Sequence, residues 1–193
     1  MDRQDKKLKI SANAKSHIPC LLQLFREYGY DGATLAKISE ATGLGKASLY
    51  HHFPGGKEQM VEAVLDFLED WVEENIARPL QSDGEASTRL QRMCDRISEL
   101  YENGEQPCLL AILLMGSARD LFHAKVSLRL RGWIEAIAAV LIEAGTSEIL
   151  AKQRAENAII AIQGSLILSR GLDDPTIFQR TIQEIPDNLC QGL

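Results

Sequence analysis

Apolar residues recur along this chain of 193 residues with the period of an α-helix. The first run with the i, i+3, i+4, i+7 spacing is Ile18, Leu21, Leu22 and Phe25. We expect Gly29 to end that helix. Pro19 lies in its first turn, so either the regular helix begins near Ile18 or an earlier turn is kinked. No segment has the alternation of a strand, and the pattern predicts an all-α protein with about nine helices.

Two short helices with a glycine between them are predicted next. Thr34 is a good N-cap for a helix that carries Leu35 and Ile38. Gly43 then breaks the chain, because glycine takes turn conformations that are closed to most residues. A second short helix is expected from about Lys46 to His52.

Longer helical segments fill the rest of the chain, separated by glycine, proline and polar turns. We expect them at about residues 57–77, 90–101, 107–115, 120–144 and 147–171, with a last short helix beginning at Asp174-Pro175. Arg78-Pro79 is expected to end the first of these helices, since the residue before a proline disfavours helical conformation.

The order of short helix, glycine turn and short helix near the front is that of a helix-turn-helix motif. In that motif the second helix enters the major groove with its first residues toward the base edges, here Gly45, Lys46, Ala47 and Ser48. Lys46 can donate to guanine or to a phosphate. Tyr50, His51 and the amino end of the next helix, at Lys57, are placed to reach phosphates.

Charge is divided unevenly along the chain. The net charge is −6 overall, yet residues 1–57 hold nine Lys or Arg and five Asp or Glu, an excess of four positive charges. The remainder holds 12 basic and 22 acidic residues. A basic front on an acidic body suggests that the front meets a polyanion, although a solvated basic arm has the same composition.

Residues 11–58 resemble the DNA-binding domain of TetR-family transcriptional regulators, on the stretch LFREYGYDGATLAKISEATGLGKASLYHHF and the KE that follows. The stretches HHFPGGKE and PCLLAILL resemble sequences of one subgroup of this family, the lincomycin- and flavonoid-responsive repressors. The resemblance implies a DNA-binding domain at 11–58, with its motif at about 34–53, and a ligand-binding and dimerisation domain at 59–193. It implies a DNA face made of Thr34, Lys37, Gly45, Lys46, Ala47, Ser48, Tyr50, His51 and Lys57.

Three features depart from the family pattern. Gly45 stands where a capping serine is usual, the turn before Lys57 is one residue longer, and Pro19 is unexpected in the first helix. The pair His51-His52 has no Cys, Asp or Glu at metal-ligand spacing, so we expect no metal and no cofactor. Phe53 is interpreted as core, whereas Tyr50 suits the core and the DNA face equally well.

Residues 59–193 contain no motif that we can connect to chemistry, so no enzyme is expected. The resemblance implies a pocket for a small molecule between helices of this part. Our candidates for its lining are Phe67, Trp71, Met93, Cys94, Ile97, Tyr101, Leu114, Arg119, Phe122, His123 and Trp133. For each of them alone, packed core is a commoner role than ligand contact.

The resemblance also implies a homodimer through the last two long helices. Small and apolar residues there allow close helix contact: Ala158, Ala161, Ile162, Gly164, Ser165 and Leu168, with Ala138, Leu141 and Ile142 facing them. A core within one chain would use the same residues. A two-fold operator requires a two-fold protein, which favours the dimer.

The cysteines Cys20, Cys94, Cys108 and Cys190 form no C-x-x-C pair and follow no secretory signal, which favours a cytoplasmic protein. The longest apolar run, 108–115, is too short to span a membrane. We therefore expect a dimeric repressor that an apolar or aromatic molecule releases from a palindromic double-stranded operator. One alternative is a redox or electrophile sensor acting through Cys94 or Cys108. The other, a helical carrier or enzyme, is disfavoured by residues 43–53.

Overall fold

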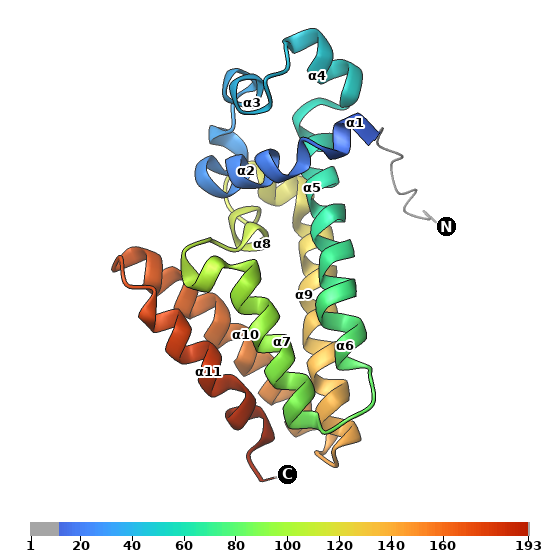
Figure 1. Cartoon of the computed structure of the whole chain (residues 1–193), viewed down its shortest axis with the longest axis vertical. Coiled ribbons are helices and arrows are strands. Elements are labelled where there is room, and N and C mark those ends of the chain that lie inside the picture. Colours follow the sequence, from blue (N-terminus) through green and yellow to red (C-terminus); the bar gives the residue numbers. More distant parts are fainter. Residues whose placement is uncertain (1–11, 193) are drawn as a thin grey trace.

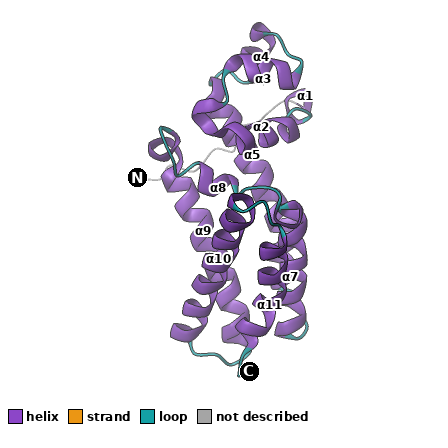
Figure 2. Ribbon diagram, turned by 90° about the vertical axis from the view of Figure 1, so that its left-hand side faces the viewer, coloured by secondary structure: helices purple, strands orange, loops and turns teal. Residues whose placement is uncertain are grey.

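The computed structural model describes residues 12–192, and within them all regular structure is helical, which confirms the predicted fold class (Figures 1 and 2). The helices in chain order are α1 (Ala12–Lys15), α2 (Ile18–Gly32), α3 (Leu35–Thr42), α4 (Lys46–His52), α5 (Gly56–Val72), α6 (Arg78–Leu80), α7 (Ala86–Leu100), α8 (Leu109–Ile112), α9 (Ala118–Glu143), α10 (Glu148–Gly171) and α11 (Thr176–Cys190). A π-helical turn, Glu73–Ala77, joins α5 to α6, and a 3₁₀ turn, Glu102–Gly104, follows α7.

The helices form two parts that share α5. Helices α1 to α4 and the first turns of α5 make one end of the molecule. Helices α7, α9, α10 and α11 make the body, and α8 packs on α2 (Figure 1). The boundary that we expect between residues 58 and 59 lies within α5. No helix of the described part is both long enough and apolar enough to cross a bilayer.

The small end is held together by a compact apolar centre. The side chains of Leu21, Phe25, Ile38, Leu49 and Phe53 are fully buried there. Each such side chain stabilises the fold by about 1.5–3 kcal/mol relative to full exposure. Because α2, α3 and α4 all bury side chains in this one centre, their packing fixes the angles between them. Helices of this length are only marginally stable alone.

The start of α2 settles the alternatives left open for Pro19. The helix begins at Ile18, so Pro19 lies in the first turn, where its missing amide hydrogen costs no helical bond. At the other end, Gly29 has the positive φ of +67° and interrupts the helical path as expected, but one further turn runs on to Gly32. That turn carries Tyr30 and Asp31 toward the body.

Two predicted helix boundaries in the middle of the chain were wrong. The helix expected to stop at Arg78-Pro79 continues through the π turn as far as Leu80. A π turn widens the helix just ahead of Pro79, where a proline ring otherwise clashes with the preceding turn. The apolar run 107–115 forms only the single helical turn of α8. Its side chains at 109, 110 and 113 are nevertheless buried, so the apolar pattern reflects burial and not a longer helix.

In the body, α10 packs against both α9 and α11, and α7 packs on α11 (Figure 2). The last helix, expected to be short, has 15 residues. One close approach in this part requires a glycine. Gly104 has a φ of +101°, and a Cβ there would lie 2.7 Å from the Cβ of Phe178.

Candidate nucleic-acid interface and inner cavity

Helix α4 presents nearly all of its surface to solvent. Only Leu49 is buried, whereas Gly45, Lys46, Ala47, Ser48, Tyr50 and His51 are exposed. A helix with one buried residue contributes little to the core, so its exposed donors are free to contact another molecule. This is the surface that the sequence assigned to the major groove.

The turn between α3 and α4 has the predicted geometry. The hydroxyl oxygen of Thr34 accepts a hydrogen bond from the amide of Lys37 at 3.3 Å and so caps α3. Gly43 has a φ of +67°, the left-handed conformation, at the end of that helix. Gly45 precedes α4 without any side-chain cap, as expected for a glycine at this position.

The three lysines expected on the DNA face differ in their partners. The ammonium group of Lys37 lies 3.5 Å from the ring centre of Tyr28. That of Lys57 donates to the carbonyl oxygen of Tyr30 at 2.7 Å and lies over the same residue's ring. Lys46 makes no ion pair or hydrogen bond with any residue of the described part. Lys46 is therefore the lysine least engaged by the protein itself.

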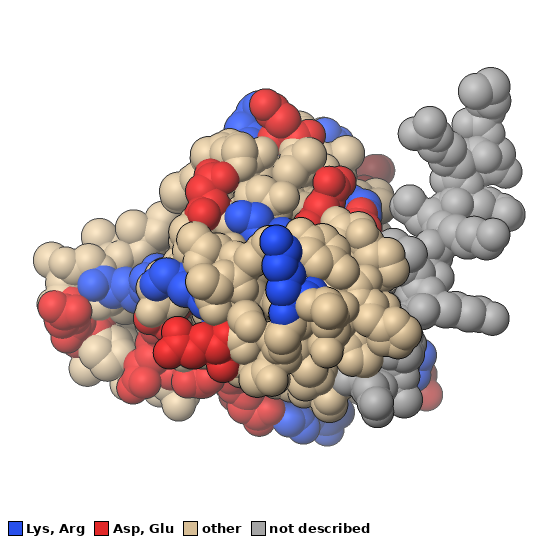
Figure 3. Space-filling view, turned by 90° about the horizontal axis from the view of Figure 1, so that it is seen from above, with Lys and Arg blue, Asp and Glu red and all other residues tan. Residues whose placement is uncertain are grey.

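The charge of this end is modest. Seen from the small end of the molecule, the surface is largely uncharged, with Lys or Arg side chains on it and carboxylates toward the edge (Figure 3). Residues 1–11 hold Arg3, Lys6, Lys7 and Lys9 against Asp2 and Asp5, which is half of the positive excess expected for residues 1–57. That half lies outside the described residues.

Three imidazole rings gather where α4 meets the start of α2. The ring centres of His51 and His52 are 5.4 Å apart, and those of His17 and His52 are 6.1 Å apart. No group of His, Cys, Asp or Glu side chains among the described residues has the arrangement of a metal site. The rings therefore add hydrogen-bonding groups to the exposed surface of α4.

The end of α2 is fastened to the start of α9. The carboxylate of Asp31 accepts hydrogen bonds from the amide and the hydroxyl of Ser117, the residue before α9. These bonds hold the pKa of Asp31 below its usual value. The ring of Tyr30 packs edge-on against Phe122, with the ring centres 5.6 Å apart. Sequence-distant residues thus join the small end to the body.

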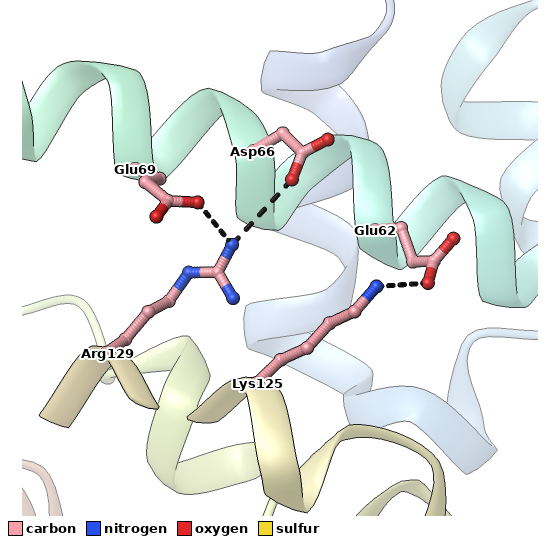
Figure 4. A network of polar contacts seen from close by, with 5 residues as sticks. All are labelled: Glu62, Asp66, Glu69, Lys125 and Arg129. Carbon is pink, nitrogen blue, oxygen red and sulfur yellow. Dashed lines mark hydrogen bonds and ion pairs between the residues drawn. The ribbon is translucent and has the colours of Figure 1, made fainter. Parts of the chain in front are cut away.

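A second set of contacts joins α9 to α5 (Figure 4). Lys125 pairs with Glu62, and one nitrogen of Arg129 lies 2.7 Å from Glu69 and 3.7 Å from Asp66. All three acids belong to α5, the helix that the two parts share. These ion pairs therefore connect α9 to the helix that follows α4.

The body encloses a cavity of about 540 Å³ between α5, α7 and α9, a volume typical of sites for small organic molecules. Its walls are mostly apolar and include Leu65, Leu68, Val72, Ile76, Met93, Ile97, Leu109, Trp133, Ile137 and Ile162. Charged residues on the wall are Arg26, Glu69, Glu73, Arg129 and Glu135. Leu128 and Gly132 on α9 line the cavity and are also exposed, so its mouth opens along α9.

Of the eleven candidates for the pocket lining, four line this cavity: Met93, Ile97, Tyr101 and Trp133. Phe67 and Trp71 do not, because the inward stripe of α5 is Leu65, Leu68 and Val72. An α-helix turns by roughly 100° per residue, so Phe67 points away from this stripe, and its side chain is 39% exposed.

The other five candidates also lie outside the cavity. Phe122 is buried against Tyr30, and Leu114 packs on the core. Arg119 and His123 are exposed on the outer side of α9. Cys94 faces α11 and lines a small polar groove with Gln91 and Gln179. The expectation that these residues gather around one pocket was therefore wrong, since they lie on faces that different helices cover.

Arg26 lines the inner cavity although the sequence did not predict it there. It belongs to the basic front by sequence, but its side chain is only 6% exposed and ends at this cavity. Its terminal nitrogen donates to the carbonyl oxygen of Leu100 at 3.1 Å. Burial lowers the pKa of this guanidinium, and the neighbouring Tyr101 and Cys108 partly oppose that change. The available signal was its position directly after the apolar residues Leu24 and Phe25.

The cysteines are all free, and Cys94 and Cys108 are buried. Burial raises the pKa of Cys94 to about 12 and also raises the pKa values of Cys20 and Cys190. Reactive cysteines need the opposite shift, because the thiolate is the nucleophile. The environment of Cys94 thus speaks against a thiol sensor at this position.

The face expected for dimerisation is partly buried within the chain. Ala158, Ile162 and Ser165 are buried within the chain, as are Ala138 and Leu141 on α9. Of the other expected residues, Gly164 is half-buried, Leu168 is 53% exposed and Ile142 on α9 is 44% exposed. The large apolar residues that α10 exposes are Ile149, Leu150, Ile160, Ile167 and Leu168. Of these, Ile160 and Ile167 lie on the same side of α10 as Gly164 and Leu168 and were not among the expected residues.

A small helix-turn-helix end with an exposed second helix, joined by a shared helix to a larger helical body, defines a DNA-binding transcriptional regulator with a second, helical domain. Comparison with known families agrees. The family model described as "Bacterial regulatory proteins, tetR family" matches residues 21–64, and that described as "Transcriptional regulator LmrA/YxaF-like, C-terminal domain" matches residues 86–184. The chain therefore belongs to the TetR family of transcriptional regulators, which are not enzymes.

Individual relatives match nearly the whole chain. This chain is 26% identical over 171 residues to the HTH-type transcriptional regulator LmrA of Bacillus subtilis, and the match covers 86% of this chain and 91% of that protein. A TetR transcriptional regulator from Legionella pneumophila has a TM-score of 0.78 at 21% identity and covers 92% and 97% of the two chains. CifR, solved as a cysteine mutant with 26-base-pair operator DNA, has a TM-score of 0.74 at 16% identity, covering 96% and 99%.

Proposed function

We propose that this protein is a homodimeric repressor that binds a near-palindromic operator and is released when an apolar or aromatic molecule enters the inner cavity. The observation that carries the proposal is the pairing of an exposed α4 with a cavity of about 540 Å³ in one chain. The complex of CifR with operator DNA supports DNA binding by this fold.

The proposed DNA face consists of the residues expected from the sequence: Thr34, Lys37, Gly45, Lys46, Ala47, Ser48, Tyr50, His51 and Lys57. Within it, Lys46 and Ser48 are assigned to base edges, since the first turn of a recognition helix faces them. Tyr50, His51 and Lys57 are assigned to phosphates, where a donor fixes register without reading sequence. Thr34 contributes by holding the start of α3.

Release is assigned to the contacts between the two parts. Leu65, Leu68 and Val72 of α5 line the cavity, while the first turn of the same helix follows α4. A ligand that displaces the cavity wall therefore moves α5 and, through Lys125 and Arg129, also α9. In a dimer this changes the distance between the two reading helices. Coupling of this kind is typically about 1–3 kcal/mol.

Dimerisation is assigned to the exposed stripe of α10 formed by Ile160, Gly164, Ile167 and Leu168. An apolar stripe of this kind is unusual on a free surface, and the glycine lets a second helix approach closely. A two-fold axis beside this helix places two copies of α4 in one complex, as a palindromic operator requires.

The test is a footprint of the purified protein on its own upstream region, followed by calorimetry of ligand binding with and without the operator duplex. We expect two half-sites with centres roughly 10 base pairs, or a multiple of that, apart. DNA and ligand must weaken each other by the same factor. A single asymmetric half-site, or a cavity ligand whose affinity is indifferent to DNA, contradicts the proposal.

A further inference from the structure

Arg26 belongs to α2, in the small end of the molecule, yet its guanidinium group forms part of the wall of the cavity in the body. The side chain is 6% exposed, and its Nε has no hydrogen-bond partner among the described residues. Its one hydrogen bond goes to the carbonyl oxygen of Leu100. A buried cation with unused donors is costly unless something anionic or strongly accepting meets it.

The other arginine of the cavity wall is in a different situation. Arg129 pairs with Glu69 and Asp66 on α5, so its charge is already compensated within the protein. No carboxylate of the described residues forms an ion pair with Arg26. Arg26, which comes from the DNA-binding part, is therefore the arginine of the cavity wall without an ion pair among the described residues, while the charge of Glu102 favours its charged form.

Arg26 has polar neighbours on the wall of the cavity, which also carries Arg129 and the carboxylates of Glu69, Glu73 and Glu135 among its apolar side chains. Tyr101 and Cys108 line the cavity beside it and are both buried. Burial raises the pKa of the Tyr101 hydroxyl well above its usual value, so this group stays protonated and can donate a hydrogen bond. Leu68, Val72 and Trp133 supply apolar surface on the wall of the same cavity.

We propose that the cavity binds organic acids with an apolar or aromatic body and one carboxylate, and that Arg26 receives the carboxylate. A planar guanidinium matches a carboxylate, and the charge-assisted hydrogen bonds formed in a site shielded from water are the strong ones. The apolar walls accept the body of the molecule, which a cavity of about 540 Å³ accommodates.

This assignment also explains how a bound ligand would contact the DNA-binding part of the chain. It rests on the proposed function, in which a cavity ligand alters operator binding. A carboxylate at Arg26 contacts α2 itself, one turn before Tyr30 and Asp31, which fasten α2 to α9. The ligand then bridges the two parts directly and competes with Leu100 for the guanidinium.

The experiment measures binding to the full chain in the absence of DNA by calorimetry. The probes are octanoate, naphthalene-2-carboxylate and dodecanoate, each compared with its own primary amide, which has nearly the same shape and no charge. We expect at least one acid to bind roughly tenfold to a hundredfold more tightly than its amide. Binding of none of the acids, or equal affinity of acid and amide in every pair, overturns the proposal.

Variants identify the group responsible. Arg26→Met removes the cation and keeps a long apolar stem, and it should abolish the preference for the acid over the amide. Arg96→Met is the matched control, since Arg96 is exposed on α7 and pairs with Glu99. It changes the net charge equally and should leave the preference intact. A preference that survives Arg26→Met places the carboxylate elsewhere and overturns the assignment.

A measurement on the unmodified protein gives a result that does not depend on whether the variant folds. The Nε–H signal of Arg26 can be assigned in nitrogen-15 NMR spectra through its own side-chain carbons. It should shift with the bound acid and not with the amide, and an unmoved signal contradicts the proposal. Because no DNA is present, a negative result here is distinct from failure of operator binding, which the footprint tests separately.

Discussion

The carboxylate of Asp31, in the last turn of α2, accepts two hydrogen bonds from Ser117, the residue that precedes α9. The two residues are 86 positions apart in the chain. Gly116 beside them has a φ of +58°, and a Cβ there would lie 2.4 Å from a carboxylate oxygen of Asp31. An acid fitted closely to a helix start thus joins the DNA-binding part to the body, beside the packing of Tyr30 on Phe122.

We expect Asp31→Asn to lower the melting temperature at neutral pH, because an amide offers one acceptor oxygen where the carboxylate has two. The pKa of Asp31 lies below its ordinary value of 3.8, since the bonds from Ser117 favour the charged form. Its contribution to stability is therefore fully present above pH 3.8 and lost as the pH falls through the lower, folded-state pKa. Melting curves of both proteins against pH should converge in acid. A difference that persists there contradicts a charge-based joint.

Lys46→Ala should weaken operator binding by about 1–3 kcal/mol if Lys46 contacts a base edge, and specificity at that position should relax. If Lys46 contacts a phosphate, affinity should fall by the same factor on all sequences. Binding curves on the operator and on point-substituted duplexes separate these outcomes. Arg92→Ala, which removes an exposed positive charge from α7, is the control. Unchanged affinity for every duplex rules out α4 as the reading helix.

The affinity for DNA should fall steeply as the salt concentration rises, because the basic front displaces counterions from phosphates. Removing residues 1–11 deletes Arg3, Lys6, Lys7 and Lys9. We expect the slope of log affinity against log salt to decrease by about 0.9 for each phosphate that these side chains neutralise in the intact protein. Replacing these four residues by glutamine should have the same effect as the deletion. A slope that neither change alters means that this segment does not meet the DNA.

Ile160→Glu should dissociate the proposed dimer. Each copy loses the burial of one isoleucine, and the two-fold axis doubles the loss to about 3 kcal/mol or more. Sedimentation measurements over a range of concentrations report the change. The control is Met115→Glu, because Met115 is also 67% exposed but lies on the turn before α9. If Ile160→Glu sediments like the parent protein, the interface lies elsewhere.

Cys94 should resist alkylation in the folded protein. Because its pKa is about 12, the reactive thiolate is scarce at neutral pH and increases only in strong alkali. Mass spectrometry of iodoacetamide-treated protein, native and unfolded, measures this directly, and Cys94→Ser should retain the response to ligand. Fast modification of native Cys94 together with loss of DNA binding would support the thiol-sensor alternative.

Features set by neighbours in sequence were predictable. The helix at Lys46–His52, the cap at Thr34 and the left-handed Gly43 each depend on interactions within about one turn of chain. The same holds for the overall class, because helical periodicity appears in every segment. The chemistry of the candidate DNA face follows too, since α4 buries only Leu49, leaves His52 half-buried and exposes its other residues.

What the sequence by itself determined was therefore the helices, their order and the reading motif. Only the tertiary structure decided which side of each helix is covered. Phe67 and Leu68 are adjacent and equally apolar, yet one is exposed and the other lines the cavity. Arg26 was counted as surface charge and is buried at the cavity wall. The physical reason is that a helix repeats its own geometry locally, whereas its burial depends on helices that lie many residues away in the chain.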